Sequence, residues 1–464
     1  MTLLFIIALL CSVYVAWSIG ANDVANAVGT SVGSGALTLK QAVVIAAIFE
    51  FCGAFFLGGR VSETVESGIV NPDLFSIDKA DYIYGMLASL LAAGIWLQIA
   101  SFFGWPVSTT HSIIGAVLGF GLVFGGVHAI YWRALLSIFF SWILSPLLGG
   151  ALAYLIFSIV RRKILYQSQP VLAAKRLAPY FTFVIFAVLT LIILFKGLSG
   201  INLSINPLLV LVIALFVGVF FALITAFLVK KIQEPTTPFY SHNLQVEVGL
   251  KKAQKHLERT KVASMGELES KIHHVLDEVK EIAKEVGVRE ERYTGYQQVE
   301  KIFIYFQIII ACAMAFAHGS NDVANAIGPF SAIFNTLRNE PIGGQSIPIW
   351  LLILGGGGLV VGLATWGWRV IETVGKKITE LTPSRGFSAG FGAAVTIVLA
   401  SKLGLPISTT HVLVGAVLGV GLARGIEVIN LNVIRDIVVA WFVTVPAGAI
   451  LSALFFFILR AIFS

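Results

Sequence analysis

The decamer GANDVANAVG at residues 20–29 returns almost unchanged as GSNDVANAIG at residues 319–328, with eight of ten positions identical. Each copy places an Asp and two Asn directly beside a long apolar run. An ionised side chain inside a membrane is costly without a partner, so such residues are rare there and usually functional. The repeated decamer therefore indicates a duplicated polar site beside hydrocarbon.

The composition defines the class of protein. The chain has 464 residues, of which 57% are hydrophobic and only 12% charged, whereas a soluble domain is about one quarter charged. This predicts a polytopic membrane protein. The net charge of +7 is explained by basic residues flanking the spans, so we expect no nucleic-acid partner. The apolar N-terminus lacks a basic region and a cleavage site, which favours a first span over a signal peptide.

A second duplicated segment extends the internal similarity. GWPVSTTHSIIGAVLGFGL at 104–122 matches GLPISTTHVLVGAVLGVGL at 404–422 at 13 of 19 positions. The apolar runs predict seven spans before a polar gap and five after it. Because seven is odd, the second copy enters the membrane upside down, as in many secondary transporters. A parallel duplication with a wrong span count is the alternative.

We therefore predict an all-α polytopic membrane protein with two inverted-topology repeats, broken or re-entrant helices and about 12 transmembrane segments. With the N-terminus outside, the predicted inner loops carry about twice as many Lys and Arg as the outer loops, which fits the positive-inside rule. The predicted parts are a first transmembrane repeat (1–162), two additional spans (163–231), a cytoplasmic amphipathic helical linker (232–300) and a second, inverted repeat (301–464).

The linker differs in composition from the rest of the chain. It alternates charge signs and places apolar residues such as Ile272, Val275 and Val279 at helical spacing, which predicts one or two amphipathic helices. Four of the chain's eight histidines lie here, and a solvated helix face is the simpler interpretation of them than a regulatory metal or pH site: His242, His256, His273 and His274.

The two decamers are predicted to bind cations. Carboxylate, amide and backbone carbonyl oxygens are the ligands that hard cations such as Na⁺ prefer. The flanking glycines Gly20, Gly29, Gly319 and Gly328 are expected to let the helix break and release carbonyls. The alternative is that Asn and Asp merely cap a helix. The predicted sodium ligands are Asn22, Asp23, Asn26, Asn321, Asp322 and Asn325.

The second motif is predicted to bind an anion. Pro disfavours helix just before it and Ser is a good N-cap, so a helix is expected to start at each motif, inside the membrane. Its unpaired N–H groups and dipole would attract an anion without a cationic side chain. Hydroxyl back-bonding at a helix kink is the alternative. The predicted anion ligands are Ser108, Thr109, Thr110, Ser408, Thr409 and Thr410.

The two predicted sites explain each other. A multiply charged oxyanion is tolerated beside two aspartates when cations lie between them, which indicates cation–anion symport. Glu50 lies within a span, and the second half has glycines in the corresponding region, so Glu50 could gate, pair with a histidine or bind a proton. His111, His318 and His411 could donate to the anion or shuttle protons. The Gly-x-x-x-Gly pairs at 115–119 and 415–419 indicate close helix packing.

With these motifs the chain resembles the inorganic phosphate transporter family, the Pit-type sodium- or proton-coupled phosphate symporters. The duplicated GANDVANA and GSNDVANA segments look like that family's signature. The resemblance implies phosphate as substrate, inverted repeats, a large cytoplasmic loop and a homodimer. It also implies that Asp23 and Asp322 are essential, that the two Ser-Thr-Thr segments line the substrate site, and that Glu50 matches a family glutamate with no partner in the second half.

The predicted function is secondary active transport in the cell membrane, with inward sodium flux driving phosphate uptake by alternating access. The alternative is proton-coupled transport of metal–phosphate or sulfate through the same site. An anion channel is less favoured, because a channel would not need paired Asp/Asn turns. A membrane enzyme acting on phosphate groups is less favoured, because the sequence lacks a nucleophile–base pair and a catalytic metal cluster. The lack of a G-x-x-x-x-G-K-[ST] nucleotide loop argues against ATP as the energy source. We therefore expect no enzyme activity, no cofactor, and no metal other than co-transported sodium.

Overall fold

The computed structural model describes residues 2–72, 79–103, 107–167, 169–194, 206–230, 253–254, 257, 267–285, 290–342, 346–367, 382–425 and 431–463. Regular structure within these residues is helical, apart from an isolated β-bridge between Val70 and Ile130. The predicted all-α class is therefore confirmed.

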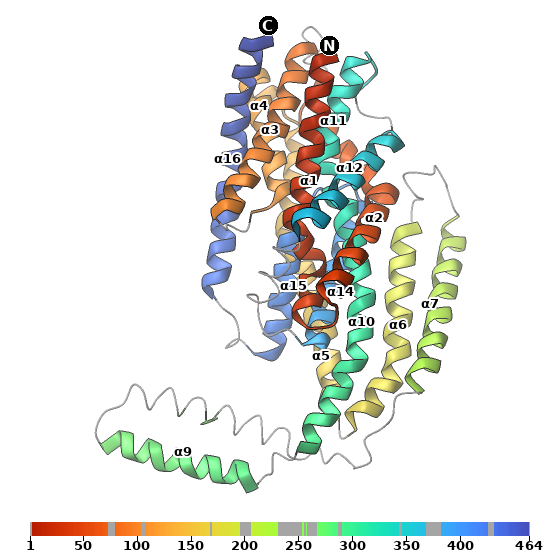
Figure 1. The fold of residues 1–464 in the computed structure, drawn as a ribbon, viewed down its shortest axis with the longest axis vertical. Coiled ribbons are helices and arrows are strands. Elements are labelled where there is room, and N and C mark those ends of the chain that lie inside the picture. Colours follow the sequence, from red (N-terminus) through yellow and green to blue (C-terminus); the bar gives the residue numbers. More distant parts are fainter. Residues whose placement is uncertain are drawn as a thin grey trace. The chain divides into compact units, whose positions relative to one another are not determined.

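Figure 1 shows the helices in chain order. Those of the first part are α1 (Thr2–Gly33), α2 (Leu39–Ser67), α3 (Lys79–Phe103), α4 (Thr109–Gly125), α5 (Trp132–Val160), α6 (Pro170–Leu194) and α7 (Pro207–Lys230). Those of the second part are α9 (Glu267–Glu285), α10 (Glu290–Asp322), α11 (Ala324–Leu337), α12 (Ile349–Gly362), α14 (Pro383–Lys402), α15 (Thr409–Arg424) and α16 (Leu431–Phe463).

The helices are those of a multi-pass membrane protein. Nine helical segments in the described part of the chain are long and apolar enough to cross a membrane. The shorter apolar helices α4 and α15, together with α14, bring these described segments to the predicted number of about 12. Their outer faces are apolar, as hydrocarbon requires: on α7, for example, Phe216 is 70% exposed and Phe227 is 63% exposed.

The chain forms two compact units. One comprises residues 1–157, 183–219 and 304–464, and the other comprises residues 158–182 and 220–303. Both duplicated motifs lie in the first unit. The main buried apolar cluster of that unit joins α1, α2, α3, α4, α11 and α16 around large side chains such as Tyr82, Phe120 and Phe330.

The second unit contains α9, the helix expected in the linker. Ile272 and Leu276 are buried along one side of α9, whereas Val275 is 44% exposed. The predicted helical segment is thus confirmed over Glu267–Glu285. His242, His256 and most of the segment 231–266 lie outside the described residues.

In the first unit, α1 runs antiparallel to α10 and α11. Near the start of α1, the ring of Phe5 lies 5.9 Å from that of Phe330 in α11. Near its end, Ser31 accepts a hydrogen bond at 2.9 Å from the side-chain amide of Gln307 in α10. In Figure 1, the N-terminal end of α1 accordingly lies at the same end of the bundle as α11. The helices that carry the two decamers therefore have opposite directions.

The two Gly-x-x-x-Gly pairs confirm the predicted close packing, and each packs on a helix of the opposite half. A Cβ at the second glycine of the 115–119 pair would lie 2.3 Å from the carbonyl oxygen of Ala449 in α16. A Cβ at the second glycine of the 415–419 pair would lie 2.0 Å from that of Gly150 in α5. Glycine is required at these positions because the neighbouring backbones occupy the space of a side chain.

The prediction that the helix breaks at the flanking glycines is wrong for the first decamer. Helix α1 passes through it without interruption. The second decamer is interrupted, but at Val323, between α10 and α11. Gly20 and Gly319 instead allow close helix packing. A Cβ on Gly20 would lie 2.0 Å from the carbonyl oxygen of Leu359, and a Cβ on Gly319 would lie 2.0 Å from that of Glu50.

Candidate functional site

Helices α4 and α15 begin where the sequence predicted. The Ser108 hydroxyl accepts a hydrogen bond at 3.2 Å from the backbone N–H of His111. The Ser408 hydroxyl accepts the equivalent bond at 3.3 Å from His411. Both serines have extended backbone and act as N-caps. The first N–H groups of each helix have no intrahelical acceptor, so each start carries the positive end of a helix dipole.

The two helix starts meet in the interior of the first unit. The Thr110 hydroxyl donates to the Ile407 carbonyl at 3.0 Å. The rings of His111 and His411 have centroids 4.6 Å apart. Two adjacent positive helix ends suit negatively charged groups, both carboxylates beside them and an anion such as phosphate.

The asparagines of the two decamers each reach a threonine of the opposite half. The Asn26 side-chain amide donates to the Thr410 hydroxyl oxygen at 2.7 Å. The Asn325 side-chain amide donates to the Thr110 hydroxyl oxygen at 3.2 Å. The contacts are reciprocal, since each decamer meets the Ser-Thr-Thr segment of the other half.

The aspartates contact threonines of their own half. The Thr409 hydroxyl donates to Asp322 Oδ2 at 3.0 Å, and the Thr109 hydroxyl hydrogen-bonds Asp23. Both aspartates are buried, with exposed fractions of 6% for Asp23 and 0% for Asp322. Asp23 Oδ2, Asp322 Oδ1 and the side-chain oxygen of Asn325 make no hydrogen bond with the described residues. These buried oxygens are suited to ligating cations.

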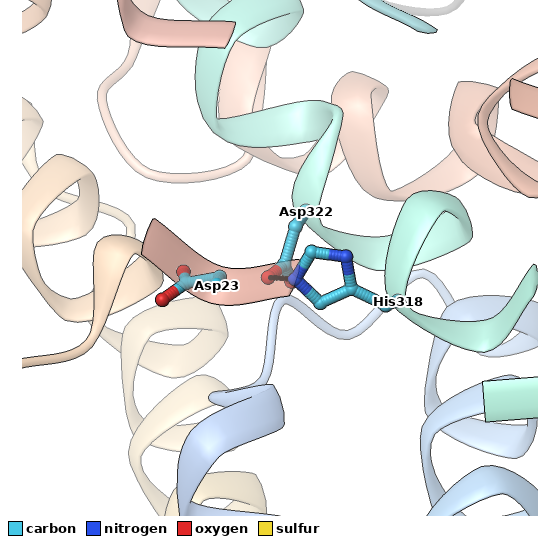
Figure 2. A group of neighbouring side chains, drawn as sticks. All are labelled: Asp23, His318 and Asp322. Carbon is cyan, nitrogen blue, oxygen red and sulfur yellow. Dashed lines mark ion pairs between the residues drawn. The ribbon is translucent and has the colours of Figure 1, made fainter. Parts of the chain in front are cut away.

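Glu50 joins this group from α2. The Nδ1 atom of His318 lies 3.0 Å from Glu50 Oε1, and its Nε2 atom lies 3.0 Å from Asp322 Oδ2. All three side chains are fully buried. Figure 2 shows the His318 ring against the Asp322 carboxylate, with Asp23 on the neighbouring helix α1. Among the roles left open for Glu50, the structure shows pairing with a histidine.

The other two candidate histidines lie in the first turns of α4 and α15. The ring of His111 lies 3.8 Å from that of Trp142. Neither ring nitrogen of His111 makes a hydrogen bond with the described residues. His411 packs against His111 from the opposite half. Both are interior residues beside the candidate anion site.

The loop between α14 and α15 is held by side chains of four helices. Its carbonyls accept hydrogen bonds as follows: Gly404 from Thr64 at 2.6 Å, Leu405 from Asn321 at 3.0 Å, Pro406 from Trp142 at 2.9 Å and Ile407 from Thr110 at 3.0 Å. The side-chain oxygen of Asn321 also accepts from the Ile407 N–H at 3.2 Å. Asn321 therefore supports this loop, and its sodium-ligand role stays a prediction. Asn22, its counterpart, is half-buried on α1.

Two buried polar residues of these helices were not singled out from the sequence. Gln307 in α10 donates to Thr30 at 3.2 Å and to Ser31 at 2.9 Å. Glu66 in α2 is 1% exposed and accepts from the Asn335 amide at 2.7 Å. Two features of the sequence could have indicated these residues. Gln307 is a lone Gln within the apolar run IFIYFQIII, and Glu66 is an acidic residue near the end of a span.

Comparisons with known proteins identify the family of the chain. The model of the phosphate transporter family matches residues 19–452. A protein of Chlamydia pneumoniae described as a phosphate permease is 53% identical over 460 residues, covering 99% of each chain. The chloroplast inorganic phosphate transporter 2-1 of Arabidopsis thaliana is 42% identical over 98% of this chain and 72% of its own length.

A solved structure is similar over the full length. The sodium-dependent phosphate transporter superposes with a TM-score of 0.78, at 35% sequence identity and with 100% of both chains covered. The resemblance stated from the duplicated motifs is thus confirmed. The chain belongs to the phosphate transporter family, a family of transporters and not of enzymes.

Proposed function

We propose that this protein couples inward sodium flux to the uptake of inorganic phosphate by alternating access. One observation carries the proposal: the starts of α4 and α15 lie together, and the Asp and Asn side chains of both decamers hydrogen-bond to their threonines. A phosphate beside two buried carboxylates is unstable unless cations lie between them, because uncompensated buried charge costs several kcal/mol. Cation and anion must therefore bind together.

The anion is bound by the helix starts and their hydroxyls. Ser108 and Ser408 cap the helices, and Thr109 and Thr409 are oriented by the aspartates. Thr410 accepts a hydrogen bond from Asn26, so its hydroxyl hydrogen is available to the anion. Hydroxyls and backbone N–H groups of this kind bind phosphate without a cationic side chain.

The cations are bound by the decamers. Asp23 with Asn26, and Asp322 with Asn325, each offer carboxylate and amide oxygens to one sodium ion, with Asn22 as a further candidate. Sodium as the coupling ion is supported by the structural relative, a sodium-dependent phosphate transporter.

We further propose that residues 1–162 and 301–464 are inverted repeats. The antiparallel course of α1 and α10–α11 supports this, as do the reciprocal Asn–Thr contacts. Such a pair can expose one central site to either side in turn. Residues 163–231 add two spans, and residues 232–300 form a cytoplasmic linker. The N-terminus lies outside, as the distribution of Lys and Arg indicates, and the chain forms a homodimer in the cell membrane.

Uptake of labelled phosphate into proteoliposomes tests the coupling. We expect saturable accumulation against a phosphate gradient when Na⁺ is higher outside, and only background uptake when choline replaces Na⁺. In the control, the same total Na⁺ is present without a gradient across the membrane. Accumulation in this control would mean that Na⁺ activates uptake without driving it. Accumulation driven by a pH gradient without Na⁺ would overturn sodium coupling in favour of the proton-coupled alternative. Competition by sulfate in the same assay measures which anion the site accepts.

A further inference from the structure

The cluster of Asp23, His318 and Asp322 has a composition that sodium does not require. Each residue offers one ligand atom, and these atoms all lie within 4.8 Å of one another. All three side chains are buried, and they come from helices α1 and α10 (Figure 2). Sodium prefers oxygen ligands, so a sodium site has no need of the imidazole nitrogen as a ligand.

Two carboxylate oxygens of the cluster have no bonding partner among the described residues. Asp23 Oδ2 and Asp322 Oδ1 make no hydrogen bond there. His318, by contrast, has a carboxylate 3.0 Å from each ring nitrogen, that of Glu50 at Nδ1 and that of Asp322 at Nε2. Buried polar atoms are normally satisfied, so two unsatisfied carboxylate oxygens indicate a bound cation.

Glu50 orients the His318 ring toward the cluster. Its Oε1 atom lies 3.0 Å from Nδ1, on the side of the ring away from Asp322. Asp322 lies equally close to Nε2, so a metal ion bound at Nε2 takes the place of the proton there, while Glu50 keeps the proton on Nδ1. A carboxylate behind a histidine is the usual support of a metal-binding imidazole.

We propose that Asp23, His318 and Asp322 bind a divalent first-row transition-metal ion, such as Co²⁺, Mn²⁺ or Zn²⁺, in competition with sodium. One nitrogen and two carboxylates suit these ions. A divalent ion also carries the charge of two sodium ions, so it compensates the same carboxylates. The inference deepens the proposed function, since it assigns an inhibitory ion to the sodium-binding carboxylates.

Titration of the purified full-length protein with Co²⁺ alone, in sodium-free buffer, tests this. We expect visible absorption bands of protein-bound Co²⁺ that saturate at a single site. Added Na⁺ should raise the Co²⁺ concentration at half-saturation, whereas added choline should not. Absent bands, or bands that Na⁺ leaves unchanged, would overturn the proposal.

Variants identify the ligands. His318→Gln should weaken Co²⁺ binding at least tenfold, and Glu50→Gln by about 10- to 100-fold, as for other supporting residues. His274→Gln is the matched control, because His274 is an exposed histidine of α9. His318→Cys should add a thiolate-to-Co²⁺ band in the near ultraviolet, a gain of signal that a misfolded protein would not give. Normal Co²⁺ binding in His318→Gln, or no such band in His318→Cys, would contradict the assignment.

The metal titration separates this inference from the proposed function, because it needs no transport. If sodium does not drive uptake but the protein still binds Co²⁺ in competition with Na⁺, sodium coupling is refuted and the metal site is not. If sodium drives uptake but the protein does not bind Co²⁺ in competition with Na⁺, the metal site is refuted and sodium coupling is not.

Discussion

Each buried aspartate of the site has one oxygen near a threonine hydroxyl and another without a hydrogen bond to the described residues. The first contact orients the threonine, and the second oxygen is available to a cation. Asp23 and Asp322 therefore link the proposed cation and anion sites directly. Asn26 and Asn325 make the corresponding link to the threonines of the opposite half.

The first prediction concerns these carboxylates. Asp23→Asn or Asp322→Asn should lower sodium-driven phosphate uptake at least tenfold, because the neutral amide no longer compensates a cation. Initial uptake rates at increasing Na⁺ in proteoliposomes measure this. Glu66→Gln is the matched control, since it makes the same isosteric change at a buried acid bonded to Asn335. Wild-type Na⁺ dependence in the Asp variants would refute their assigned role.

The second prediction concerns the phosphate-binding hydroxyls. Thr410→Val should raise the phosphate concentration at half-maximal uptake by roughly tenfold, because a hydrogen bond to a charged group contributes about 1.5–3 kcal/mol. Thr409→Val and Thr109→Val should also weaken apparent affinity. Thr396→Val is the control, because its buried hydroxyl bonds only the Gly392 carbonyl of its own helix among the contacts described. An unchanged half-saturation in all three variants would exclude this anion site.

At the scale of elements, glycines set how closely the helices approach. Helix α15 meets α5 through the 415–419 pair, and α4 meets α16 through the 115–119 pair. These crossings bring the two helix starts together from opposite halves. The loop before α15 is held at the same time by donors from α2, α4, α5 and α10. The site therefore depends on backbone packing that no ligand residue provides.

The third prediction tests this packing. Gly419→Ala should destabilise the protein by about 1–3 kcal/mol, as overpacking does, because the added methyl would lie 2.0 Å from the carbonyl oxygen of Gly150. Gly357→Ala in α12 is the matched control, since nothing lies within 4 Å of its added methyl. Thermal unfolding in detergent should show a lower midpoint for the first variant and an equal or higher one for the second. Equal midpoints in both would contradict the close crossing.

At the scale of the whole molecule, neither half completes the site alone. Asp–Thr contacts form within each half, whereas Asn–Thr contacts form between the halves. A movement that separates the halves breaks the second set and spares the first. This division is consistent with the alternating access proposed for the transporter.

The fourth prediction concerns orientation. Asn339, beyond the end of α11, is predicted to lie outside the cell, and Glu278 of the linker helix α9 is predicted to lie in the cytoplasm. In a background with Cys11, Cys52 and Cys312 replaced by Ala, a membrane-impermeant maleimide should label Asn339→Cys in intact cells. It should label Glu278→Cys only after permeabilisation. The reverse pattern would require the opposite orientation, and equal labelling of both in intact cells would contradict the predicted span count.

Much of the site followed from local sequence. Composition determined the membrane class, since long apolar segments satisfy their own backbone hydrogen bonds in lipid when they form helices. The Pro and Ser of each second motif determined the helix starts at Thr109 and Thr409, because capping is a property of a few consecutive residues. Duplication indicated that both decamers and both hydroxyl segments belong to one site.

Only the tertiary structure decided which residues meet. Nothing local distinguishes Thr110 from Thr410 as the partner of Asn26, and the observed pair is 384 residues apart in sequence. The contact of Glu50 with His318 depends on the crossing of α2 and α10, which Gly319 permits. Caps and apolar periodicity are set by neighbours in the chain, whereas these pairings are set by how closely distant backbones pack.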